Sequence, residues 1–142
     1  MKILLAVDGS KASLGAVDSL VAHAQWYREA PHVELVTVHL PIPLLRGLSA
    51  VVSKAQVQQY YDEEGKANLA DAEKKLARAG IKYQARVLVG PIADTIVKHA
   101  KASGCDLICI GTRGMAAAAN ALLGSTATKV LHLATIPVLV AR

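Results

Sequence analysis

Phenylalanine is absent from this 142-residue sequence, and only one tryptophan and four tyrosines stand in a chain that is 53% hydrophobic. A core with so little aromatic bulk depends on Val, Ile, Leu and Ala, the composition of buried parallel strands covered by helices. Apolar runs are also short, far from the roughly 20 residues of a membrane-spanning helix. The opening residues, MKILLAVDGS, are too briefly apolar for a signal peptide. We therefore expect no membrane partner.

Cysteines and clustered charges are scarce as well. Cys105 and Cys109 lie four residues apart around a predicted strand, which would separate them by about 13 Å, too far for a disulfide. We interpret both as reduced, buried thiols of a cytoplasmic protein, without the further ligands of a metal site. The formal net charge is +5, but no five-residue basic run occurs. We expect no nucleic-acid partner, because such surfaces combine clustered cations with exposed aromatics.

Five apolar segments predict β-strands, and the segments between them carry helical periodicity and capping signals. Strands are expected over residues 2–7, 33–40, 82–89, 106–111 and 136–142, and helices over 11–28, 53–79, 91–104 and 125–133. Crossovers of this length make neighbouring strands parallel. The sequence predicts one doubly wound α/β domain, residues 1–142, with a five-stranded parallel sheet in the order 3-2-1-4-5 and helices on both faces.

Aromatic, histidine and charged residues on the predicted helices are assigned structural roles. Trp26, Tyr60 and Tyr61 are expected to pack in the core or in a groove. On the long helix, Asp71 and Lys75 are expected to pair on the exposed face. Four histidines show no ligand spacing and are expected at the surface or between helices: His23, His32, His99 and His132.

Ligands of doubly wound sheets bind beyond the carboxyl ends of the strands, where the strand order reverses. Here the first and fourth strands flank the reversal, so the turn Asp8-Gly9-Ser10 and the loop that begins at Gly111 should border one crevice. His39-Leu40-Pro41 follows the second strand at the same edge. The sequence therefore predicts a binding site at this edge.

The loop from Gly111 to Thr126 has residues that suit a polyphosphate. Gly111 and Gly114 permit positive φ and a close approach of the backbone to a ligand. Gly124-Ser125-Thr126 begins a helix whose free N–H groups favour a phosphate. The alternative is that Gly111 only ends a strand and that Gly124-Ser125 is an ordinary helix cap. Neither G-x-x-x-x-G-K-[ST] nor a G-x-G-x-x-G after the first strand is present.

The spacing Gly111-x-x-Gly114, nine residues, then Gly124-Ser125 resembles the G-2x-G-9x-G-[S/T] signature of the ATP-binding branch of the universal stress protein family. KILLAVDGS resembles the family's first strand, VHL the end of its second, and TKVLHLATIPVLVAR its closing helix and strand. The resemblance covers essentially the whole chain. It implies an ATP-binding stress-response or regulatory protein, with Mg²⁺ accompanying the nucleotide.

The resemblance also implies a role for each site residue. Asp8 would contact the ribose, and the backbone near Ala6 and Leu40 would frame the adenine. Apart from the resemblance, an ionised Asp8 only accepts hydrogen bonds, so it could also hold a phosphate-bound Mg²⁺. Arg113 is either an extra phosphate contact or a solvated side chain. The remaining residues would pass near the ribose and hold the phosphates: Gly111, Gly114, Gly124, Ser125 and Thr126. Residues 115–123 offer little polar contact beyond Asn120, so affinity would rest mainly on backbone groups.

Two other functions compete with ATP binding. Asp8, Ser10 and His39 could form a nucleophile system only if Ser10 met an imidazole base; we interpret Ser10 as a helix cap and His39 as an end-of-strand residue. The segment AVDGSKAS also lacks the paired glycines of an ATP pyrophosphatase loop. We expect no dedicated enzyme and at most slow ATP hydrolysis. The other alternative is an interaction module that binds no nucleotide.

Two segments are expected to make contacts outside the nucleotide site. Residues 41–53 are either a mobile lid or partner surface, or a loop packed permanently on the long helix; their apolar residues are Ile42, Leu44, Leu45 and Leu48. The strand at 137–141, PVLVA, lies at a sheet edge in the predicted order, where bare backbone groups invite pairing. The resembled family commonly pairs this strand with its twin, so we expect a homodimer.

Overall fold

The computed structural model describes residues 1–43, 53–112 and 123–141. In chain order the elements are β1 (Lys2–Ala6), α1 (Lys11–Ala22), a short 3₁₀ turn η1 (Ala24–Trp26), β2 (His32–His39), α2 (Lys54–Arg78), β3 (Tyr83–Val89), α3 (Ile92–Ala102), β4 (Leu107–Gly111), α4 (Ser125–Leu133) and β5 (Val138–Ala141). The strands form one sheet in the order β3-β2-β1-β4-β5, and every pair is parallel. The predicted fold class and strand order are confirmed.

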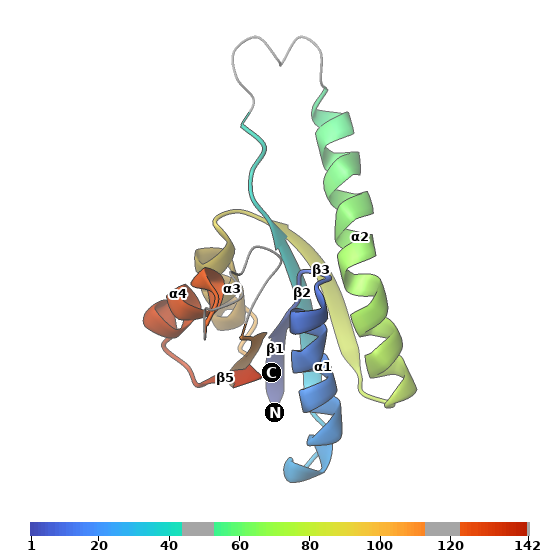
Figure 1. The fold of residues 1–142 in the computed structure, drawn as a ribbon, viewed down its shortest axis with the longest axis vertical. Coiled ribbons are helices and arrows are strands. Elements are labelled where there is room, and N and C mark those ends of the chain that lie inside the picture. The colour runs from blue at the N-terminus through green and yellow to red at the C-terminus, as the bar shows by residue number, and fades with distance from the viewer. Residues whose placement is uncertain (44–52, 113–122, 142) are drawn as a thin grey trace.

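Helices cover both faces of the sheet, with α1 and α2 on one side and α3 and α4 on the other (Figure 1). Because β1 is the central strand, its side chains are buried on both faces. Ile3 and Leu5 pack toward α1 and α2, whereas Leu4 and Ala6 pack toward α3 and α4. This two-sided burial explains why the strand reads as a continuous apolar run rather than as an alternating one.

The first helix is shorter than its sequence pattern predicts, because α1 ends at Ala22 instead of near residue 28. His23 forms its C-cap, and the His23 ring nitrogen Nδ1 also contacts the Ser19 carbonyl at 2.7 Å. The imidazole lies against Trp26, with ring centroids 3.9 Å apart. Trp26 is 74% exposed and Tyr60 is 49% exposed. The expectation of core packing was wrong for these two aromatics, because both are exposed and their ring contacts within the described residues are with His23 and Tyr61 of the same segments.

The long helix α2 begins with a capping box, in which Ser53 and Gln56 satisfy each other's backbone N–H groups. Its N-terminal turns extend beyond the carboxyl edge of the sheet (Figure 1). Lys75 pairs with Asp18 of α1 instead of the expected Asp71, which contacts Lys74. The helix buries a stripe at helical spacing, formed by Tyr61, Gly65, Leu69, Ala72 and Leu76.

The buried carboxylate of Glu34 connects three strands and a helix through its contacts with charged and polar side chains. Glu34 of β2, with a side chain only 2% exposed, accepts from Arg86 Nε of β3 at 2.7 Å and contacts Lys2 Nζ of β1 at 3.1 Å. His99 Nε2 of α3 lies 3.2 Å from the same carboxylate. Burial alone would raise the pKa of Glu34, but hydrogen bonds from Arg86, Lys2 and His99 outweigh it and lower the pKa. Glu34 is therefore ionised at neutral pH.

We predict that Glu34→Gln lowers the free energy of unfolding by about 2–3 kcal/mol at pH 7, because it leaves partly buried cations without their counter-charge. Since the folded-state pKa of Glu34 is lowered, its contribution is present above the ordinary glutamate pKa of about 4.3 and is lost as pH falls below it. Urea unfolding followed by circular dichroism should therefore show that the difference in free energy of unfolding between wild type and variant decreases from about pH 5 to pH 3.

Asp71→Asn is the matched control, because the Asp71–Lys74 pair is about two-thirds exposed on both sides. Its cost should stay below about 0.5 kcal/mol. Two results would contradict a stabilising role for the ionised Glu34. One is an equal loss of free energy of unfolding in the two variants, and the other is a loss in Glu34→Gln that does not change with pH.

Candidate functional site

The adjacent strands β1 and β4 end side by side at the carboxyl edge of the sheet. Ala6 pairs with Ile110 near the ends of these strands. From there the chain leaves β1 toward α1 on one face and leaves β4 toward α4 on the other. Connections that diverge to opposite faces from adjacent parallel strands mark the position where ligands of doubly wound sheets bind.

The turn after β1 is fixed by its own side chains. Asp8 Oδ1 accepts from the Ser10 amide at 3.0 Å, and the Asp8 amide donates to Ser13 Oγ at 3.3 Å. Ser10 Oγ accepts from the Ser13 amide at 3.1 Å, which confirms Ser10 as the N-cap of α1. The half-buried Asp8 carboxylate is therefore held at the carboxyl edge in a defined orientation.

Gly9 brings α2 into contact with this turn. Its φ is +78°, a conformation that favours glycine, and a Cβ there would lie 2.8 Å from Asn68 Oδ1 of α2. Helix α2 therefore supports the Asp8 turn as well as the face of the sheet.

Gly111 has a packing role that the sequence did not reveal. Its φ is not positive; the left-handed glycines in the described part of the chain are Gly9, Gly80, Gly90 and Gly104. A Cβ on Gly111 would lie 2.7 Å from the carbonyl oxygen of Ala12 and 3.1 Å from Cα of Ser13. Gly111 does not use the positive φ that glycine permits; its missing side chain instead lets the first turn of α1 lie directly on the end of β4.

The N-terminus of α4 is attached to the end of β4. The Gly124 amide donates to the Thr112 carbonyl at 2.6 Å, so this N–H is already engaged. Gly124 is the N-cap, with φ −72° and ψ 157°, and provides no capping side chain. Ser125 is exposed and Thr126 half-buried, and their N–H groups belong to the first turn, which has no intrahelical acceptors. Such a helix start attracts anions.

The segment after β2 is attached to α2 through Tyr61. The Tyr61 hydroxyl donates to the Leu40 carbonyl at 3.3 Å and accepts from the Ile42 amide at 2.7 Å. The ring is 6% exposed, as expected for a core aromatic, and its centroid lies 5.7 Å from that of His39. The sequence pattern did not reveal these two hydrogen bonds, although a buried tyrosine hydroxyl generally needs a partner.

No nucleophile system forms among the described residues. Ser10 Oγ caps α1 by accepting from the Ser13 amide rather than contacting an imidazole. Ser103, His99 and Glu34 lie close together, but Ser103 and Glu34 both contact Nε2 of His99, so the ring cannot relay a proton from one to the other. The described residues also contain no group of three His, Cys, Asp or Glu able to hold a metal.

Several predicted residues lie outside the described part of the chain. These are Arg113, Gly114 and Asn120 of the glycine loop and Leu44, Leu45 and Leu48 of the expected lid. Cys105 and Cys109 are buried free thiols, as expected, and burial raises the pKa of Cys109 to about 12. No helix in the described ranges is long and apolar enough to cross a membrane.

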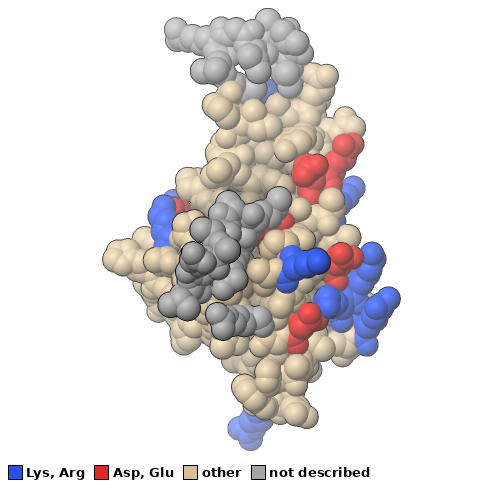
Figure 2. Space-filling model, viewed as in Figure 1, with Lys and Arg blue, Asp and Glu red and all other residues tan. Residues whose placement is uncertain are grey.

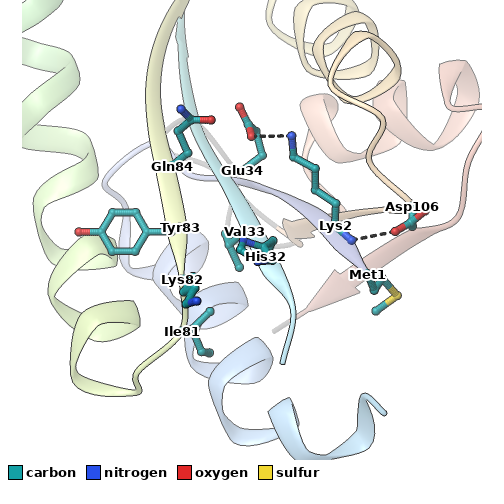
Figure 3. Close-up of a pocket in the computed structure, with 10 residues that line it drawn as sticks. All are labelled: Met1, Lys2, His32, Val33, Glu34, Ile81, Lys82, Tyr83, Gln84 and Asp106. Carbon is teal, nitrogen blue, oxygen red and sulfur yellow. Dashed lines mark hydrogen bonds and ion pairs between the residues drawn. The ribbon is translucent and has the colours of Figure 1, made fainter. Parts of the chain in front are cut away.

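A cavity of about 750 Å³ lies at the opposite, amino edge of the sheet (Figure 3). Its carboxylates are already paired, because Glu34 contacts Lys2 Nζ and Asp106 accepts from the Lys2 amide at 2.7 Å. We interpret it as a solvated groove over the Glu34 cluster. On the face drawn in Figure 2, acidic and basic side chains are interspersed rather than gathered into a basic stripe.

Comparison with known proteins gives the family. The model of the universal stress protein family matches residues 1–142. The chain belongs to the universal stress protein family. Universal stress protein YxiE of Bacillus subtilis is 32% identical over 149 residues, which cover 99% of this chain and 98% of that protein.

Universal stress proteins of known structure share the fold. The structure of MJ0577, a protein of Methanocaldococcus jannaschii, superposes with a TM-score of 0.82 at 28% identity and covers 99% of this chain and 94% of its own. A universal stress protein in complex with cAMP has a TM-score of 0.72 at 24% identity, covering 100% and 97% of the two chains. One from Arabidopsis thaliana with AMP bound has a TM-score of 0.70 at 16% identity, covering 99% and 90%.

We predict that Gly111→Ala lowers the free energy of unfolding by about 1–3 kcal/mol, because the added methyl group meets backbone atoms of α1 that cannot move independently. Chemical denaturation measures this directly. Gly80→Ala is the control, since Gly80 has φ +67° but no atom within 4 Å of a Cβ; its cost of about 1–2 kcal/mol comes from the backbone alone. A Gly111→Ala variant as stable as wild type would show that this glycine is not required for packing.

Proposed function

We propose that this universal stress protein binds ATP with Mg²⁺ at the carboxyl edge of its sheet, between β1 and β4, and acts as a nucleotide-dependent regulator in the stress response. The whole of residues 1–142 would form one nucleotide-binding domain. The main support is the hydrogen bond from the Gly124 amide to the Thr112 carbonyl, which brings the start of α4, without a side-chain cap, to the end of β4. Strand β4 pairs with β1, and the Asp8 turn follows directly after β1. A carboxylate and an anion-attracting helix start at one edge suit the two ends of a nucleotide.

Each part of the nucleotide has a proposed partner. Asp8, acceptor-only when ionised, suits the ribose hydroxyls or a phosphate-bound Mg²⁺. The backbone at Ala6 and Leu40 suits the adenine, and Gly111 lies where the ribose would pass. The phosphates would accept hydrogen bonds from the first N–H groups of α4 and from the hydroxyls of Ser125 and Thr126. Arg113 and Gly114, outside the described residues, complete the glycine signature.

Binding without dedicated catalysis fits the described side chains best. The Ser10 hydroxyl is engaged at the cap of α1, which leaves the Asp8 turn without an activated nucleophile. Two proteins of the same fold are known in complex with cAMP and with AMP, which supports an adenine nucleotide as the class of ligand. The buried free thiols suit a reducing, cytoplasmic environment. The alternative is an interaction module that binds no nucleotide, and titration calorimetry of the wild-type protein with ATP distinguishes the two.

We predict that Gly124→Val abolishes ATP binding, measured by titration calorimetry, without unfolding the protein. Gly124 has φ −72° and ψ 157°, which valine adopts readily, so the fold should lose only about 1 kcal/mol from a poorer N-cap. The branched side chain would instead obstruct the approach of the phosphates to α4. Gly124→Ala is the graded control and should weaken binding less. A folded valine variant with wild-type affinity would contradict the phosphate assignment.

We also propose a homodimer formed by β5 at the edge of the sheet. Ile108 donates to the Pro137 carbonyl and Thr112 to the Ala141 carbonyl, so alternate residues of this strand, 137 and 141 among them, direct their backbone groups toward β4. Val138 and Val140 then direct theirs outward, where a second copy can pair with them. Leu139, whose side chain is 39% exposed, adds apolar surface beside this edge.

We predict that Val140→Pro converts the dimer to a monomer at tens of micromolar protein, as measured by light scattering. Proline removes an outward N–H but no donor to β4, so the sheet itself should remain. Val140→Thr keeps both the N–H group and the β-branched shape and should stay dimeric. A wild-type protein that is already monomeric at this concentration would contradict the strand-pairing proposal.

A further inference from the structure

The three residues that follow β2 depend on a single side chain for their position. The β2–β3 ladder ends at His39, whose carbonyl accepts from the Gly90 amide at 2.9 Å. Beyond that point, the hydrogen bonds that hold Leu40 and Ile42 in the described part of the chain both run to the Tyr61 hydroxyl. Leu40 is 61% exposed, so packing of its own side chain does little to fix it.

Tyr61 itself is held firmly. It belongs to the buried stripe of α2, and its ring is 6% exposed. The His39 ring lies beside it, with centroids 5.7 Å apart. The same helix touches the Asp8 turn through Asn68 and Gly9. A rigid helix therefore sets the position of the Leu40 carbonyl relative to the Asp8 turn.

The Leu40 carbonyl retains capacity for a ligand. A carbonyl oxygen has two lone pairs, and the bond from Tyr61 is long, at 3.3 Å. The shorter bond, at 2.7 Å, is the one in which the Ile42 amide donates to the hydroxyl. Tyr61 therefore anchors the segment mainly through Ile42 and orients the Leu40 carbonyl while leaving it able to accept a second hydrogen bond.

A fixed carbonyl can distinguish two classes of purine. The 6-amino group of adenine donates hydrogen bonds, whereas the 6-oxo group of hypoxanthine or guanine only accepts them. A carbonyl held opposite the 6-oxo group would face another acceptor, and both would lose their partners when buried by the base. The strength of this discrimination depends on how well the carbonyl is held in place.

We infer that Tyr61 is a positioning residue for base selectivity: its hydroxyl fixes the Leu40 backbone so that the site accepts 6-aminopurine nucleotides in preference to 6-oxopurine nucleotides. This inference rests on the proposed function, since it requires that the base lie at Leu40. Tyr61 acts through Leu40 and does not itself contact the nucleotide.

Titration of MgATP and MgITP into Tyr61→Phe tests the inference, because the two nucleotides share the ribose and the triphosphate and differ only along one edge of the base. ATP has a 6-amino donor and an N1 acceptor there, whereas ITP has a 6-oxo acceptor and an N1–H donor. The variant keeps the ring and removes only the hydroxyl. We expect wild type to prefer MgATP, and the variant to bind MgATP about 3- to 10-fold more weakly, the value of one hydrogen bond, with unchanged affinity for MgITP. Tyr60→Phe, at the neighbouring half-exposed ring, is the matched control and should behave as wild type.

The outcomes separate this inference from the proposed function. Wild-type protein that binds neither nucleotide overturns the proposed function, and the inference with it. Wild type that binds MgATP, with an unchanged ratio of the two affinities in Tyr61→Phe, overturns the role of Tyr61 alone. Equal weakening toward both nucleotides also overturns it, because a purely structural tyrosine would act without regard to the base.

Discussion

The parallel pairing of β1 with β4 is the contact on which the rest of the molecule depends. Ile3 to Ala6 pair with Leu107 to Ile110 at the centre of the sheet, and the two strands send their helices to opposite faces. The parallel direction brings the Asp8 turn and the start of α4 to the same edge. Any ligand that bridges β1 and β4 therefore binds to the part of the sheet that is buried on both faces, where the backbone is most rigid.

Glycines at this edge have packing roles in addition to the binding role that we propose for Gly111. Gly111 belongs to a signature associated with nucleotides, yet a side chain there would collide with the backbone of α1. Gly9 and Gly65 are similar, because their missing side chains let α2 approach the Asp8 turn and Val87 of β3. The close approach of α1 and α2 to this edge therefore requires these glycines whether or not a ligand is bound.

The fold could be predicted from the sequence because each strand is a short aliphatic run and each crossover is long enough to hold a helix. The topology alone also indicated the carboxyl edge at which we propose the binding site. The Glu34 cluster was missed, because its partners Arg86 and His99 lie 52 and 65 residues away in the chain. The end of α1 and the hydrogen bonds of Tyr61 were missed as well, since both depend on tertiary contacts that periodicity does not encode.

Amide chemical-shift mapping by NMR, with MgATP added to the isotope-labelled protein, tests directly whether the carboxyl edge binds the nucleotide. The largest shifts should fall on Asp8 to Ser13, on Leu40 and Ile42, and on Thr112 and Gly124 to Ala127. Residues of the cavity at the amino edge, such as Glu34 and Gln84, should remain unchanged. Shifts concentrated around that cavity, with the first turn of α4 unaffected, would contradict a nucleotide site between β1 and β4.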